Sequence, residues 1–175
     1  MNKRTKIILS LLPVVLVFIL IFVFSSFDAT SSASQSSKIV DFIKKYIFPD
    51  LSTLKNKHDT RIVNDTISFI VRKIAHLSVY TLLGIFSFTG LWAVKNKKKR
   101  YFTAVGICMA YAITDEIHQS FVPGRSCEIR DVIIDTCGSA FGAFVCLVIL
   151  LLLELRQIKK QQTSAAASSD TAQTQ

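Results

Sequence analysis

Two long apolar runs constrain the fold more than any other feature of the sequence. They cover residues 7–24 and 132–153; the first contains no charged side chain and the second contains only Asp135. A helix that crosses a hydrocarbon core of roughly 30 Å needs about 20 residues. Only helices and closed barrels satisfy all backbone polar groups there, and these runs lack the alternation of barrel strands. Both runs therefore predict membrane-spanning helices.

Two further runs, residues 67–94 and 102–121, are long enough to span but contain charged residues. Counting them, the predicted fold is all-α, an integral membrane bundle of four transmembrane helices. The predicted organisation is an N-terminus with the first span (1–24), an extracytoplasmic loop (25–66), a three-helix core (67–153) and a disordered tail (154–175). The first run could instead be a cleaved signal peptide, but 18 apolar residues are long for one, so we expect it to be retained.

The net charge of +9 would suit a nucleic-acid partner if the positive residues formed one patch. They instead flank the apolar runs: Lys3, Arg4, Lys6, Lys95, Lys97, Lys98, Lys99, Arg100, Arg156, Lys159 and Lys160. Such a bias marks the cytoplasmic side of a membrane. The pattern predicts both termini in the cytoplasm and no nucleic-acid partner.

The loop between the first two spans is nearly neutral, with six basic and five acidic residues over 25–66. Within it, Ile39, Phe42, Ile43, Tyr46 and Ile47 recur at helical spacing. The spacing predicts a short amphipathic helix that lies on the outer membrane surface or packs on the bundle.

Ionisable and polar residues gather at the predicted outer ends of three spans, although a charge inside a membrane is costly. They are Arg72, Lys73, His76, Asp115, Glu116, His118, Gln119, Arg125, Glu128, Arg130, Asp131 and Asp135. Four positive and five negative residues nearly neutralise one another. Some have structural explanations, because Arg72 and Lys73 can snorkel towards headgroups and Asp131 suits a helix N-terminus.

Packing does not explain His76, Asp115 and His118, which are the candidate catalytic residues. Asp115 shares a helix face with His118 and Gln119, and Asp115 and His118 together with His76 could hold a metal. Nearby arginines and lysine would compete for the carboxylates, so we expect no metal and no cofactor. We favour an anion site in which Arg72, Arg125 and Lys73 bind phosphate or carboxylate, while Asp115 or His118 acts as acid or base.

Three motifs carry a family resemblance: RKIAH at 72–76, DEIHQSFVPGR at 115–125 and DVIIDTCG at 131–138. Together they resemble VanZ-like membrane proteins over residues 7–153. The resemblance implies a small helical protein associated with lowered susceptibility to the antibiotic teicoplanin. Beside the catalytic candidates, it implies ligand-binding roles for Arg72, Lys73, Glu116, Gln119, Arg125, Asp131 and Asp135.

The predicted function is that of a multi-pass bacterial plasma-membrane protein whose outer-facing polar pocket binds or modifies a cell-envelope lipid. Its partners would be the bilayer and a lipid-linked precursor or a lipoglycopeptide. Two alternatives stay open: a transferase or hydrolase that uses Asp115 and His118, and a non-catalytic partner whose charges only hold the helices in register. An ion pathway is disfavoured, because the inner halves of the spans have almost no ionisable groups. The sequence specifies no oligomeric state.

Overall fold

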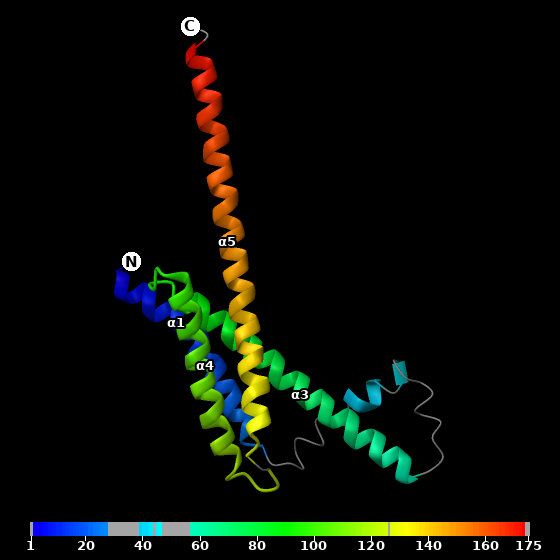
Figure 1. The fold of residues 1–175 in the computed structure, drawn as a ribbon. Helices are drawn as coiled ribbons and strands as arrows, with labels where there is room; N and C mark the ends of the chain where they lie inside the picture. The colour runs from blue at the N-terminus through cyan, green and yellow to red at the C-terminus, as the bar shows by residue number, and fades with distance from the viewer. Residues whose placement is uncertain (1, 28–38, 44, 47–56, 126, 174–175) are drawn as a thin grey trace.

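Four long helices form the described part of the protein in the computed structural model, which describes residues 2–27, 39–43, 45–46, 57–125 and 127–173 (Figure 1). They are α1 (Lys3–Ser25), α3 (Lys57–Gly90), α4 (Lys97–Gln119) and α5 (Ile129–Gln173). No strand occurs in these ranges. The all-α prediction is confirmed.

Three of the helices are long and apolar enough to cross a membrane: α1 over Arg4–Ser25, α3 over Thr60–Gly90 and α5 over Ile129–Ser164. These three helices confirm the prediction that the chain is a membrane protein. The fourth predicted span, α4, does not meet this description among the described helices. The reason is its composition, because α4 begins with a run of four basic residues and its last two turns contain Asp115, Glu116 and His118. Three spans are therefore clear, and the fourth is not.

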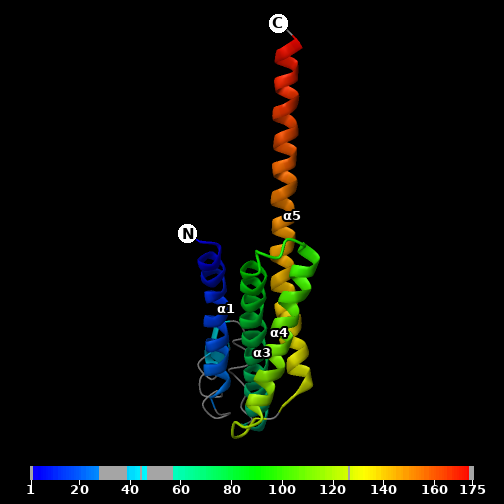
Figure 2. The same cartoon turned by 90° about the vertical axis from the view of Figure 1, so that its left-hand side faces the viewer.

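The basic residues at the starts of α1 and α4 lie at one end of the bundle, and the buried acidic residues of α4 and α5 lie at the other. α1, α3, α4 and the first part of α5 run side by side (Figure 2), and α5 packs most extensively on α3. The start of α1 and the α3–α4 connection lie at one end, whereas the end of α1 and the α4–α5 connection lie at the other. The second half of α5 continues beyond the bundle (Figures 1 and 2).

Glycines allow α3 and α5 to cross almost backbone to backbone. A Cβ atom on Gly84 would lie 2.0 Å from the Ser139 carbonyl oxygen, and one on Gly142 would lie 2.1 Å from that of Thr81. Gly138 is also close to α3, with the Leu77 carbonyl oxygen 2.7 Å from its hypothetical Cβ. Small residues at such spacing are typical of close helix pairs in membranes. The crossing brings the middle of α3, which contains His76, against the first turns of α5.

Both long helices extend beyond the predicted spans. α3 begins ten residues before the predicted start at residue 67, and an Arg61–Asp65 pair at 3.9 Å stabilises this added part. α5 continues to Gln173, where the sequence predicts a disordered tail. Alanine, glutamine and lysine are strong helix formers, which accounts for the difference.

Residues 39–43 and 45–46 are helical, at the place where the sequence predicts a short amphipathic helix. Val40 is buried, while Ile39, Phe42 and Tyr46 are exposed. Ile47 lies outside the described residues. A position on the membrane surface stays a prediction.

Candidate functional site

The polar cluster lies at the end of the bundle opposite the basic one, between α3, α4 and α5. Asp115, Glu116 and Gln119 of α4 and Asp135 of α5 are buried there. Three of these buried side chains come from the last two turns of α4. The polar residues of α4 thus lie on the face that packs against its neighbouring helices. Ionisable groups at such a place in a membrane protein usually mark a functional site.

His76, Asp115 and Asp135 meet at one point, each from a different helix. One ligand atom from each of them lies within 4.8 Å of the other two. The imidazole Nδ1 of His76 is 3.7 Å from Oδ2 of Asp135. The close crossing of α3 and α5 produces this approach, since both residues lie within two turns of the glycine contacts.

Asp115 is held in place by neutral donors. The Tyr80 hydroxyl donates to its Oδ2 at 3.4 Å, and the Gln119 amide Nε2 donates to the same oxygen at 3.1 Å. Gln119 is fixed in turn, because its Oε1 accepts from the Arg125 guanidinium at 3.1 Å and its Nε2 is 3.3 Å from Ser25 Oγ. Ser25, at the end of α1, is a member of this network that the sequence reasoning assigned to the loop.

Two buried carboxylates have oxygens without hydrogen-bond partners among the described residues. Both oxygens of Asp135 lack one, although its side chain is only 1% exposed. Glu116 accepts from the Glu128 backbone N–H at 2.9 Å through Oε2, whereas its Oε1 is unpartnered. Since buried polar atoms are normally hydrogen-bonded, these oxygens are candidates for contact with a ligand.

Most cations of the cluster are already engaged. Lys73 forms an ion pair and hydrogen bond with Asp131, and Arg130 pairs with Glu128 at 2.6 Å. Both cationic groups also lie over the Phe69 ring, at 5.1 and 5.4 Å from its centroid. Lys73 and Asp131, both predicted to bind a ligand, thus satisfy each other.

Arg72 differs from these cations. It is half-buried one turn before His76 on α3, and the structure gives it no hydrogen bond or ion pair with another described residue. Residues four apart share a helix face, so Arg72 lies on the same face as His76, one turn nearer the start of α3.

His118 points away from the group that Asp115 joins. Its Nε2 is 3.1 Å from Ser26 Oγ, and its ring stacks on Phe22 of α1 with centroids 4.6 Å apart. Residues three apart on a helix diverge by about 60° around the axis, which directs His118 towards α1 while Asp115 faces α3 and α5. The structure therefore groups His76 and Asp115 with Asp135, in the place where the sequence reasoning expected His118.

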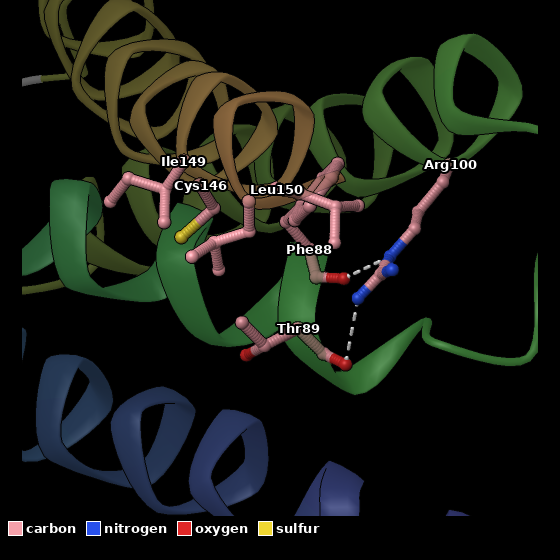
Figure 3. Close-up of a pocket in the computed structure, with 7 residues that line it drawn as sticks. Phe88, Thr89, Arg100, Cys146, Ile149 and Leu150 are labelled. Atoms are coloured by element: carbon pink, nitrogen blue, oxygen red, sulfur yellow. Dashed lines mark hydrogen bonds between the residues drawn. The ribbon is translucent and has the colours of Figure 1, made fainter. Parts of the chain in front are cut away.

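At the basic end, a cleft of about 190 Å³ lies between α3, α4 and α5 (Figure 3). Arg100 donates to the carbonyl oxygens of Phe88 at 2.5 Å and Thr89 at 3.1 Å, which are in the last turn of α3. Its guanidinium also lies 4.3 Å from the centroid of the Phe88 ring. The cation thus caps a helix C-terminus, and the cleft beside it is lined mainly by apolar side chains.

The comparisons with known proteins agree with the motifs. The model of the family described as VanZ/LLP1 matches residues 10–152, a stretch that contains the whole polar cluster. No curated protein and no solved structure matches the chain. Since the family model covers most of the 175 residues, the chain belongs to the VanZ/LLP1 family.

Proposed function

We propose that the protein crosses the bacterial plasma membrane four times, with both termini in the cytoplasm and the polar cluster on the outer side. α4 has 23 residues, about 34 Å of helix, and runs beside the three clear spans. The basic residues at the starts of α1 and α4 lie at the same end of the bundle, as the cytoplasmic bias of positive charge requires. This topology puts the ends of α1 and α4 and the start of α5 outside.

We further propose that the cluster binds or modifies the phosphate headgroup of a cell-envelope lipid or lipid-linked precursor. The observation that carries this proposal is the meeting of His76, Asp115 and Asp135 from three helices, with both carboxylates buried. A lipid in the outer leaflet reaches this depth with its headgroup. Arg72 and Arg125 are the cations best suited to the phosphate, since one guanidinium group can donate hydrogen bonds to two phosphate oxygens at once.

If the lipid is modified, His76 is the best candidate for proton transfer. Its imidazole faces the Asp135 carboxylate, which would orient it and stabilise its charged form. Asp115 lies within the same group and would contact the reacting headgroup. The sequence suggested Asp115 or His118 as the acid or base. We now propose His76 for proton transfer and Asp115 for contact with the headgroup.

Binding can be measured with undecaprenyl phosphate as the probe and undecaprenol, which lacks the phosphate, as its matched control. We expect the purified protein to prefer the phosphate, and Arg72→Gln and Arg125→Gln to weaken binding about tenfold or more, near 1.4 kcal/mol. Arg61→Gln changes the same residue type at an exposed position of α3 and should bind normally. Equal affinity for both lipids, or unchanged affinity in both cluster variants, would refute the proposal.

A link to teicoplanin follows from the family resemblance and from the lipid tail of that antibiotic. We expect expression in a susceptible Gram-positive host to raise the inhibitory concentration of teicoplanin severalfold, with vancomycin unchanged, and Asp115→Asn to abolish the effect at equal membrane abundance. Labelling of the exposed Cys127 by a membrane-impermeant maleimide, with Cys127→Ser as control, reports in the same cells whether the cluster faces outward. Protection without labelling would contradict the topology, and labelling without protection would contradict the resistance role.

A second candidate function is a partner protein whose charges are purely structural. The Lys73–Asp131 and Arg130–Glu128 pairs favour it, because they neutralise much of the cluster without a ligand. It leaves the unpartnered Asp135 oxygens unexplained. A substitution of Arg72 that leaves the paired charges intact, described in the Discussion, separates the two functions.

A further inference from the structure

The spacing of His76, Asp115 and Asp135 is that of ligands around a cation. His76 Nδ1 and Asp135 Oδ2 are 3.7 Å apart, beyond a normal hydrogen bond. Around a tetrahedral metal with bonds of about 2.0–2.2 Å, neighbouring ligand atoms are about 3.4 Å apart. Since one ligand atom from each residue lies within 4.8 Å of the others, small side-chain rotations would complete such a site.

The carboxylate oxygens needed for a metal are available. Both oxygens of Asp135 are buried without a hydrogen-bond donor among the described residues. The two hydrogen bonds that Asp115 accepts both end on its Oδ2, which leaves Oδ1 for a ligand. Burying a carboxylate without a hydrogen bond is unfavourable, and the His76 imidazole 3.7 Å away offsets this cost only when it is protonated, so a bound cation would relieve the cost at Asp135.

The charge balance also favours a divalent ion. Two carboxylates and a neutral imidazole cancel the charge of one divalent cation, and a neutral group costs far less inside a membrane than an anionic one. The sequence argument against a metal was competition from nearby cations. In the structure Lys73 pairs with Asp131 and Arg130 pairs with Glu128, so neither occupies this group.

Surrounding contacts would hold the ligands in position. Tyr80 and Gln119 fix the carboxylate of Asp115, in the way that outer residues orient metal-bound carboxylates. The glycine contacts fix α3 against α5, and with them His76 against Asp135. The site is therefore built on three packed helices.

We propose that His76, Asp115 and Asp135 together bind one divalent transition-metal ion of the Zn²⁺ or Mn²⁺ class, which prefers such nitrogen and oxygen donors. Three protein ligands leave coordination positions open for water or for an oxygen of a phosphate. The site differs from the His76, Asp115 and His118 set considered from the sequence, and it replaces the expectation of no metal. Metal binding does not depend on the lipid proposal.

The test uses the full-length protein in detergent, stripped with a chelator, without added lipid. Zn²⁺ affinity is measured by competition with a chromophoric chelator, and Mn²⁺ binding by electron paramagnetic resonance. We expect one ion per chain, and affinity reduced at least about tenfold in both His76→Gln and Asp135→Asn. His118→Gln removes a histidine of the same helix bundle that faces α1, and it should bind the metal like the parent protein.

Thermal melting with and without Zn²⁺ gives an independent readout. The ion should raise the melting temperature of the parent and of His118→Gln, and leave His76→Gln unchanged. Because His76 is half-buried rather than buried, this variant stays informative if Asp135→Asn does not fold. No metal binding by the parent, or equal binding by all folded variants, overturns the proposal. Since no lipid is present, either result leaves the lipid experiment to be judged separately.

Discussion

Gly142→Val should remove most of the folded protein from the membrane. Even the Cβ of an alanine would lie 2.1 Å from the Thr81 carbonyl oxygen and 3.0 Å from its carbonyl carbon, so α3 and α5 would have to separate. Overpacking a tight contact commonly costs about 1–3 kcal/mol, and valine adds two further methyl groups to a clash with backbone. Membrane abundance and the melting temperature in detergent measure the loss.

Gly106→Ala is the matched control for this prediction. Gly106 lies on the exposed side of α4, and a Cβ there would meet nothing within 4 Å. Alanine is the better helix former by about 1 kcal/mol, so this variant should be as stable as the parent or slightly more stable. If Gly142→Ala and Gly106→Ala melted alike, α3 and α5 would not cross as closely as described.

The second large effect is expected at the Lys73–Asp131 ion pair. Their side chains are only 22% and 20% exposed, so Asp131→Asn leaves the Lys73 charge partly buried without its partner. Removing one member of a buried pair typically costs about 3–5 kcal/mol, and we expect a loss near the lower limit. The double exchange Lys73→Asp with Asp131→Lys should restore most of it. Restoration should be incomplete, because lysine is unfavourable at the N-terminus of α5.

The pair between Lys97 and Glu154 at the basic end provides the control. These side chains are 33% and 42% exposed, so solvent screens them, and Glu154→Gln should cost at most about 1 kcal/mol. Stability is read from melting temperature in detergent. Equal losses in Asp131→Asn and Glu154→Gln would contradict a special role for the outer pair.

The charge exchange tests the structural network alone, and a substitution of Arg72 decides between the two candidate functions. A structural network requires only that the charges match, so the double exchange would restore resistance together with stability. A phosphate site depends on Arg72, Arg125 and the His76 group, which the exchange does not touch. Loss of lipid binding on changing Arg72, in a protein whose Lys73–Asp131 pair is intact, would therefore speak for a ligand site.

The sequence predicted the large features of the fold because each rests on local composition. Apolar runs located α1 and α5, and the basic flanks predicted which helix ends lie together. Of the two charged runs that were predicted as spans, the run over residues 67–94 contributes the clear span of α3, whereas the polar composition of α4 leaves its span unclear.

The membership of the central group could not be predicted, because it depends on how helices rotate against one another. Asp115 can face His118 within its own helix or His76 and Asp135 across the bundle, and sequence spacing does not choose between them. The choice follows from packing, with Phe22 and Ser26 of α1 taking His118 and the glycine crossing bringing Asp135 forward. The pattern of Gly138 and Gly142 on α5, four residues apart, was the available signal for that crossing.

The glycine crossing also determines how the protein responds to bilayer thickness. A membrane thicker or thinner than the spans is accommodated by tilting helices or by sliding them past one another. Sliding α3 along α5 would press side chains with a Cβ against the backbone that Gly84, Gly138 and Gly142 now admit. The two helices must therefore tilt as one body, and the distance between His76 and Asp135 stays the same in membranes of different thickness.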